Sequence, residues 1–188
     1  SEEVVVTLTN TGYVKRVPLN SYRSQRRGGK GRAGMTTKEE DYVNKVFVVN
    51  TLTPLLFFSS MGIVYKLKTY KIPSGSPTSK GKALVNILPL RSGEKITATM
   101  PYDQSDEKNN IIFATSSGNI RRNRLTDFHN INANGKIAMK LKEDDKLINV
   151  IICSEKENIF MSTRLGKCVR FGCNDLRIFS GRSSIGVR

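Results

Sequence analysis

A pattern that recurs four times along the chain restricts the possible folds more than any other feature of the sequence. Each copy is a run of β-branched or aromatic residues that ends in small polar residues and a glycine. The four glycines are Gly12, Gly62, Gly118 and Gly166. Such a run predicts a strand that enters a tight turn, with glycine where φ must be positive, and the chain then resumes as a second strand.

A second signature follows each predicted hairpin and keeps step with the first. It is a glycine followed by a basic residue, at Gly31 and Arg32, Gly81 and Lys82, Gly135 and Lys136, and Gly181 and Arg182. Apolar segments such as residues 84–88 and 137–141 predict a third strand, and residues 43–49, 96–100 and 147–153 predict a fourth. An acidic or glycine-containing turn precedes the fourth strand in these repeats.

Together the two signatures define repeats that start near residues 4, 54, 110 and 158. Repeats of about 50 residues with four strands each are typical of propeller-like blades. We therefore expect residues 1–188 to form a single all-β domain, with three complete blades and part of a fourth. No amphipathic helix longer than two turns is expected, and residues 125–128 are either one helical turn or a loop. An ordinary antiparallel sandwich or barrel is the alternative, but two signatures in step argue against it.

The charge of the chain indicates an anionic partner. It contains 31 Lys and Arg against 16 Asp and Glu, which gives a formal net charge of +15. Nucleic acid is the first candidate partner and an acidic membrane surface the second; no apolar stretch approaches the roughly 20 residues that a membrane span needs. The fourth residue after each turn glycine is also basic: Arg16, Lys66, Arg122 and Arg170. A cation at the same place in every hairpin suits a partner that is itself a regular array of negative charge.

Residues 25–32 carry the most distinctive chemistry, because four cations and three glycines lie within eight residues. Glycines let the main chain approach phosphates closely and offer its N–H groups to them. Arg26 and Arg27 can each grip a phosphate with two parallel hydrogen bonds, and Lys30 adds a point charge. Contacts of this kind set position and affinity without reading the base sequence.

Several other function classes are excluded because the sequence lacks the residues that they require. A P-loop has four residues between its glycines, but five lie between Gly75 and Gly81, and Ala83 follows Lys82. A zinc site is not expected, since His129 is the single histidine and the three cysteines contain no Cys-x-x-Cys pair. The sequence has no nucleophile elbow and no recognisable pair of catalytic carboxylates. We therefore expect no catalytic site and no cofactor in this chain, and free thiols in a reducing cytoplasm.

Residues 25–31 read Gln-Arg-Arg-Gly-Gly-Lys-Gly, which resembles the heptapeptide called the gyrase box. The box marks the C-terminal domains of DNA gyrase A subunits, and residues 11–15 and 85–90 also resemble that family. The resemblance runs from residue 4 to residue 188. It implies a six-bladed β-pinwheel with a strand swapped between neighbouring blades, which bends DNA around a positively charged rim and so supports negative supercoiling.

The resemblance also implies partners and site residues. The family acts on double-stranded DNA within an A2B2 heterotetramer of gyrase A and B subunits, in the bacterial cytoplasm and at the nucleoid, as part of an ATP-dependent type IIA topoisomerase, an isomerase. The catalytic tyrosine, ATP and Mg belong to other parts of that enzyme. The box residues expected to bind DNA are Gln25, Arg26, Arg27, Gly28, Gly29, Lys30 and Gly31. Rim contacts are expected at Arg32, Arg16, Lys66, Lys80, Lys82, Arg122, Lys136, Arg170 and Arg182.

The chain departs from this family in length, since six blades need roughly 300 residues and the sequence has 188. In the family, the box loop of the first blade helps bridge to the last blade. The short chain favours the C-terminal domain of the topoisomerase IV A subunit, which usually has fewer blades, whereas the intact heptapeptide favours gyrase. A propeller that serves as a scaffold for acidic proteins is the alternative from another function class.

Overall fold

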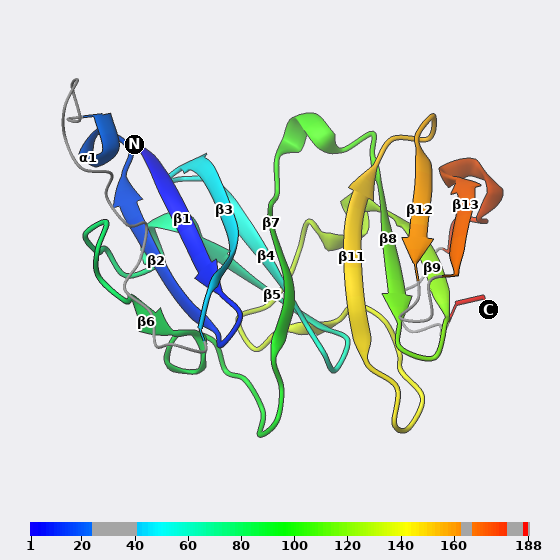
Figure 1. Ribbon diagram of the computed structural model, residues 1–188. Helices are drawn as coiled ribbons and strands as arrows, with labels where there is room; N and C mark the ends of the chain where they lie inside the picture. Colours follow the sequence, from blue (N-terminus) through cyan, green and yellow to red (C-terminus); the bar gives the residue numbers. More distant parts are fainter. Residues whose placement is uncertain (24–40, 163–166, 180–185, 188) are drawn as a thin grey trace.

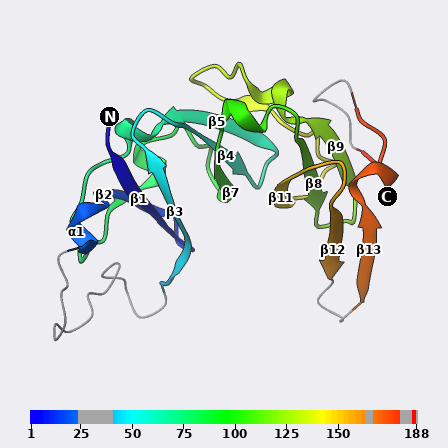
Figure 2. The ribbon, with the colours of Figure 1, turned by 90° about the horizontal axis from the view of Figure 1, so that it is seen from above.

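Four antiparallel sheets follow one another along an open arc in the computed structural model (Figures 1 and 2). The structure describes residues 1–23, 41–162, 167–179 and 186–187. Within these residues the sheets contain four, four, three and two strands, in the order of the sequence repeats. This arrangement confirms the all-β, propeller-like fold class that the repeats predict.

The first two sheets share one strand arrangement. The first contains β1 (Glu3–Thr9), β2 (Tyr13–Pro18), β3 (Val43–Asn50) and β6 (Lys82–Ala83), in the order β3-β1-β2-β6. The second contains β4 (Pro54–Ser59), β5 (Ile63–Lys68), β7 (Ile96–Pro101) and β10 (Lys136–Ile137), in the order β10-β5-β4-β7. The third contains β8 (Asn110–Thr115), β9 (Ile120–Arg124) and β11 (Leu147–Cys153), and the last contains β12 (Asn158–Ser162) and β13 (Cys168–Gly172). Strands β3, β7 and β11 lie toward the concave side of the arc (Figure 2).

Each of the first two sheets takes one edge strand from the next repeat. β6 belongs to the second repeat but pairs with β2, and β10 belongs to the third repeat but pairs with β5. In the third sheet, Val187 makes the corresponding bridge to Ile120 of β9. The chain therefore exchanges a strand between neighbouring blades, as the resemblance implied.

The exchanged strand is much shorter than the sequence analysis predicts. β6 and β10 contain two residues each, and a 3-10 turn (η2, Leu84–Asn86) replaces the strand expected over residues 84–88. Leu84 and Leu88 are buried whereas Val85 is 65 % exposed, a spacing that suits a helical turn. Residues 125–128 also form a 3-10 turn (η4, Leu125–Phe128). In the described part of the chain, no helix is long and apolar enough to cross a membrane.

Glycine is required just before the exchanged strand, because the backbone there lies against the preceding blade. Gly81 has a φ of +88°, and a Cβ at this residue would lie 2.5 Å from a carbonyl oxygen of β2. Gly186, with a φ of +92°, occupies the corresponding place against β9. The sequence analysis had assigned this place in the fourth repeat to residues 181–182, which lie outside the described residues. The structure corrects the assignment to residues 186–187, because close approach of the backbone, rather than a following cation, defines the position.

Acidic residues before the fourth strands fasten the hairpin turns. Asp41, before β3, accepts a hydrogen bond from the backbone N–H of Thr11 at 3.3 Å. Asp145, before β11, accepts hydrogen bonds from the N–H of Ser117 at 2.9 Å and from the hydroxyl of Ser116 at 2.7 Å. Burial by itself would raise the pKa of Asp145, but these hydrogen bonds outweigh it and hold the pKa well below its usual range. The recurring acidic turns are therefore structural.

The hydrophobic core lies between the sheets. Leu55 and Phe57 of β4 pack in the cluster shared with the first blade, and Leu56 and Phe58 pack in the cluster shared with the third. Because β4 is covered on both faces, it consists of a continuous apolar run instead of an alternating one. Phe58 packs edge-to-face against Phe113, with ring centroids 5.5 Å apart.

Candidate nucleic-acid interface

The segment with the most distinctive sequence chemistry lies outside the described residues. This applies to Gln25, Arg26, Arg27, Gly28, Gly29, Lys30, Gly31, Arg32 and Arg182. The described residues on either side show where the box enters and leaves the fold: α1 (Asn20–Arg23) follows β2, and Asp41 precedes β3. In the chain, the box therefore lies between β2 and β3, and its contact with DNA stays a prediction.

The recurring cations in the second strand of each hairpin hold neighbouring repeats together, and we call Arg16, Lys66 and Arg122 the clasp cations. The acceptors are the carbonyl oxygens of Ile72 for Arg16 Nε at 2.7 Å, of His129 for Lys66 Nζ, and of Leu176 for Arg122 Nη1 at 2.9 Å. Each acceptor is the tenth or eleventh residue after the turn glycine of the next repeat. A cation of one blade therefore binds the backbone of the next blade at an equivalent place.

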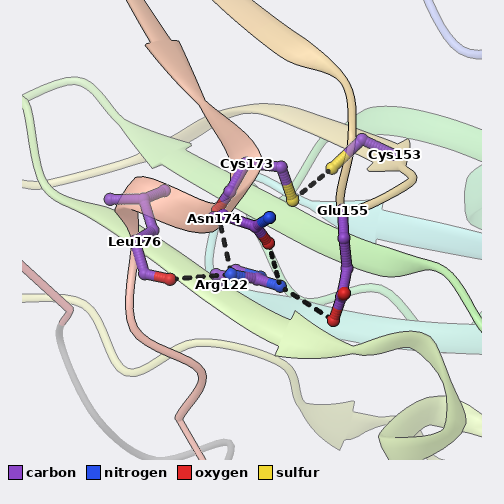
Figure 3. Close-up of polar contacts among 6 residues, drawn as sticks. All are labelled: Arg122, Cys153, Glu155, Cys173, Asn174 and Leu176. Carbon is purple, nitrogen blue, oxygen red and sulfur yellow. Dashed lines mark hydrogen bonds and ion pairs between the residues drawn. The ribbon is translucent and has the colours of Figure 1, made fainter.

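Arg122 is the most buried clasp cation, with 4 % of its surface exposed. Its Nη1 also donates to the carbonyl oxygen of Cys173 at 2.9 Å, and its Nη2 lies 3.5 Å from the Oε1 atom of Glu155 (Figure 3). The guanidinium is thus directed into the junction between the third and fourth blades. The structure differs here from the sequence analysis, which placed Arg122 on a DNA-binding rim.

The other residues at this repeat position are more open to solvent. Arg16 and Lys66 are partly exposed, and Arg170 of β13 is exposed. The guanidinium carbon of Arg170 lies 5.5 Å from the ring centre of Phe160, which is itself 72 % exposed. These three cations therefore remain able to meet an anionic partner.

Three lysines lie on or beside the exchanged strands, and we call them the edge lysines: Lys80, Lys82 and Lys136. The exchanged strands form the edge of each sheet opposite to β3 and β7. Lys82 is exposed, while the Nζ of Lys80 lies 3.9 Å from the ring centre of Tyr13. The half-buried Lys136 donates from its Nζ to the carbonyl oxygen of Asn130 at 2.8 Å. The first two boundaries between blades thus both carry lysines at the same edge.

One cation in this region escaped the sequence analysis. Lys15, next to Arg16 in β2, is 0 % exposed and donates from its Nζ to backbone carbonyls of the second repeat. The third repeat has the basic residue Arg121 at its position, and the other two have Tyr65 and Val169. Because the position is not basic in every repeat, it gave no recurring signal in the sequence.

Two cysteines meet at the junction between the third and fourth blades. The Sγ atoms of Cys153 and Cys173 lie 3.1 Å apart, and both side chains are buried (Figure 3). Burial, together with the neighbouring Cys173, raises the pKa of the Cys153 thiol to about 12. Over the ranges that the structure describes, no group of three or more His, Cys, Asp and Glu is placed to hold a metal ion.

An alkylating reagent added to the folded protein should label Cys168 and leave Cys153 and Cys173 unmodified. Cys168 is exposed, whereas the other two are buried. Only the thiolate reacts, and at about pH 8 a thiol with a pKa near 12 is ionised in about one molecule in ten thousand. Peptide mass spectrometry before and after denaturant unfolding measures the labelling. Modification of Cys173 in the folded protein as fast as Cys168 would contradict the packing of this junction.

Comparison with known proteins finds similarity over nearly the whole chain. A family model described as DNA gyrase C-terminal domain, beta-propeller, matches residues 3–50, 53–103, 109–154 and 157–188. The DNA gyrase A subunit of Rickettsia conorii is 54 % identical over 100 % of this chain and 21 % of that protein. The DNA gyrase A subunit of Haemophilus influenzae is 43 % identical over 100 % of this chain and 21 % of that protein. The chain therefore spans about a fifth of the length of the curated relatives that it matches.

Solved structures share the arrangement of sheets. The C-terminal domain of DNA topoisomerase IV matches with a TM-score of 0.85 at 25 % identity, covering 100 % of this chain and 57 % of that one. The DNA gyrase A C-terminal domain matches with a TM-score of 0.71 at 27 % identity, covering 99 % of this chain and 59 % of that one. Both likenesses extend over essentially the whole arc of blades.

Proposed function

The chain belongs to the family of DNA gyrase C-terminal domains, and from this we propose that it binds duplex DNA along the edge that carries the edge lysines and bends the DNA around the arc. The position of the edge lysines is the observation that supports this most, because they occupy the same edge of successive sheets. Since the sheets follow an arc, equivalent edges form a curved track (Figure 2). The net charge of +15 adds a field that attracts any polyanion.

The proposed contacts go to the sugar-phosphate backbone. Lysine ammonium groups bind phosphates as point charges and carry no information about base sequence. Bending a site of 20–30 base pairs by 40–90° costs about 1–6 kcal/mol for a smoothly elastic duplex, which contacts along a curved edge offset. The track includes the box, Arg32, Arg182 and the edge lysines, with Arg16, Lys66 and Arg170 beside them. Arg122 is left out, because its guanidinium faces the protein interior.

In the complete enzyme, we propose that the wrapped DNA is presented to a catalytic core. The remainder of the gyrase A chain and the gyrase B chain form that core in an A2B2 assembly of the bacterial cytoplasm. ATP-dependent strand passage by this core would convert the wrapped crossing into negative supercoils. The chain contributes binding and curvature to an isomerase, while the catalytic tyrosine, ATP and Mg are supplied elsewhere.

Changing Arg26, Arg27 and Lys30 together to Ala in the full-length protein should abolish supercoiling and leave relaxation close to normal. Relaxation requires strand passage alone, whereas supercoiling also requires that DNA be wrapped in one direction before passage. Gel electrophoresis of closed circular DNA, with and without ATP, measures both activities of the reconstituted enzyme.

The matched control for the box variant removes the same charge elsewhere. Lys108, Lys142 and Lys156 are exposed and belong neither to the box nor to the exchanged strands, so their joint change to Ala should preserve supercoiling. Equal loss of supercoiling and relaxation in the box variant would argue against a role in wrapping. So would equal loss of supercoiling in the control.

A second candidate is the corresponding domain of topoisomerase IV, which the higher TM-score of 0.85 favours. The gyrase relatives at 43 to 54 % identity and the intact box favour gyrase. Relaxed circular DNA separates the two candidates. A reconstituted enzyme that relaxes and unlinks circles but introduces no negative supercoils would select topoisomerase IV.

A further inference from the structure

Lys15, in the middle of β2, is a charged side chain with no exposed surface. Its Nζ donates to three backbone carbonyl oxygens, those of Ser76 at 2.9 Å, Pro77 at 2.8 Å and Ser79 at 2.8 Å. These acceptors lie in the loop of residues 72–81, which leads into the exchanged strand β6. An ammonium group has three N–H donors, and this loop uses all of them.

The charge of Lys15 does not reach the surface. Burial lowers its pKa, and within the described residues the structure records no ion pair between Lys15 and a carboxylate. A buried charge needs polar partners, and the three carbonyl dipoles supply them. Because the carbonyls converge on one point only when the loop is folded over β2, Lys15 and this loop conformation stabilise each other.

Further contacts hold the same loop against β2. The backbone N–H of Arg16 donates to the carbonyl oxygen of Pro73 at 3.1 Å, and the N–H of Gly75 donates to the carbonyl oxygen of Arg16 at 2.9 Å. At the other end of the loop, Gly81 approaches β2 so closely that any side chain would collide with the strand. β2 thus fixes both ends of the loop, and Lys15 fixes its middle.

The loop that Lys15 holds carries the edge lysine Lys80 and leads directly into Lys82. Lys80 directly follows Ser79, one of the three acceptors, and its Nζ lies 3.9 Å from the ring centre of Tyr13 in β2. Lys82 is paired to β2 in the exchanged strand. The direction of Lys80 is therefore set by the loop conformation, and that of Lys82 by the exchanged strand into which the loop leads.

We infer that Lys15 is a positioning residue for DNA binding, which holds the loop of residues 72–81 in one conformation so that Lys80 and Lys82 face the phosphates. The inference rests on the proposed DNA binding and deepens it. A loop fixed in advance loses less conformational entropy when DNA binds. Lys15 itself makes no contact with DNA and acts through lysines that it orients.

Changing Lys15 to Met in the full-length protein removes the ammonium group and keeps an apolar side chain of similar length. Amide hydrogen exchange in residues 74–82 should become about tenfold faster or more. The affinity for linear duplex DNA should fall about tenfold, and the log–log slope of binding against salt should fall by about 1.8, as for two lost phosphate contacts. A purely structural role leaves the slope unchanged, because the slope counts neutralised phosphates.

A double-mutant cycle tests whether Lys15 acts through the two lysines. Changing Lys80 and Lys82 together to Ala should lower affinity and slope as much as Lys15→Met does, while Lys15 keeps its three acceptors. Adding Lys15→Met to this pair should then change affinity by less than about twofold. Losses that multiply fully would overturn the positioning role.

Lys15→Arg supplies a second variant in case Lys15→Met does not fold. In the third blade, the same repeat position is occupied by the fully buried Arg121. Since the arginine keeps its charge and N–H donors, it should fold, and its amide exchange in residues 74–82 and its salt slope should change together. A change in one of these without the other would overturn the inference.

The two proposals fail in different ways. Normal affinity and slope in folded Lys15→Met protein would overturn the positioning role alone. Unchanged DNA binding after the joint Lys80→Ala and Lys82→Ala change, together with unchanged binding of the box variant, would overturn the proposed DNA track itself.

Discussion

Duplex DNA should bind this domain about a thousandfold more weakly at 200 mM salt than at 50 mM salt. Each phosphate neutralised by a Lys or Arg releases condensed counterions and contributes about 0.9 to the log–log slope of affinity against salt. With about six contacts, the slope is near 5 and the fourfold rise in salt gives this loss. The box and the edge lysines alone supply that many cations to the proposed track. Fluorescence anisotropy with labelled linear duplexes measures the slope directly.

The controls for this prediction separate DNA binding along the proposed track from nonspecific association with other parts of the surface. Duplexes of unrelated sequence should bind with affinities within about threefold of one another, because phosphate contacts do not read bases. Lys136→Ala should lower the slope by about 0.9, whereas the exposed Lys156, away from the track, should lower it by much less when changed. A slope below about 2, or strong preference for one short sequence, would contradict the wrapping proposal. Binding to acidic proteins without binding to DNA would instead favour a scaffold.

The repeated blades were predictable from the sequence because their signals are local. A hairpin needs an apolar run, a glycine turn and a second strand, and all of these are adjacent in the chain. β4 illustrates this, since its four-residue apolar core, Leu55 to Phe58, lies directly before the turn at Gly62. The exchanged strands were misjudged because two paired residues are too few to produce a periodic pattern. After β6, the apolar residues form the 3-10 turn η2 instead of continuing the strand.

Three of the recurring cations make a contact between blades that the sequence analysis did not predict. Arg16 and Lys66 lie two residues after Val14 and Val64, and both valines are fully buried. Residues two apart share a face of a strand. Arg16 and Lys66 therefore extend on the side of the neighbouring blade and donate to its backbone, while both stay partly exposed. Their regular spacing suggested a partner in solvent, and contact with such a partner stays a prediction.

The acceptors of these cations could not be predicted from the sequence. Every residue has a backbone carbonyl, so no residue type marks Ile72 or Leu176 as a partner. The three acceptors of Lys15 are equally unmarked, because they depend on how a loop of the second repeat folds over the first. The box, in contrast, is recognised by residue type alone, and it falls outside the described residues. The sequence thus identified the box, whereas only the structure identified the carbonyl acceptors of the buried cations.

Replacing Arg122 by Met should destabilise the junction between the third and fourth blades by about 3 kcal/mol. The change removes charge-assisted hydrogen bonds to the buried carbonyl oxygens of Cys173 and Leu176 and leaves both without that donor. Because each blade contacts only its neighbours, the loss should act on the β12–β13 hairpin instead of the whole domain. Amide exchange in β12 and β13 should become about a hundredfold faster, while exchange in β4 and β5 stays unchanged.

Arg170→Met is the matched control, because Arg170 occupies the same repeat position on an exposed surface. Its change should alter stability by no more than about 0.5 kcal/mol. The Arg122 variant should also keep the salt slope of DNA binding, since its guanidinium faces protein carbonyls and neutralises no phosphate. If both variants lost the same stability, the hydrogen bonds of Arg122 to the fourth blade would not account for the loss. If Arg122→Met lowered the slope, the recurring cation would have to act on DNA after all. The clasp between blades would then be incidental, and Arg122 would return to the proposed track.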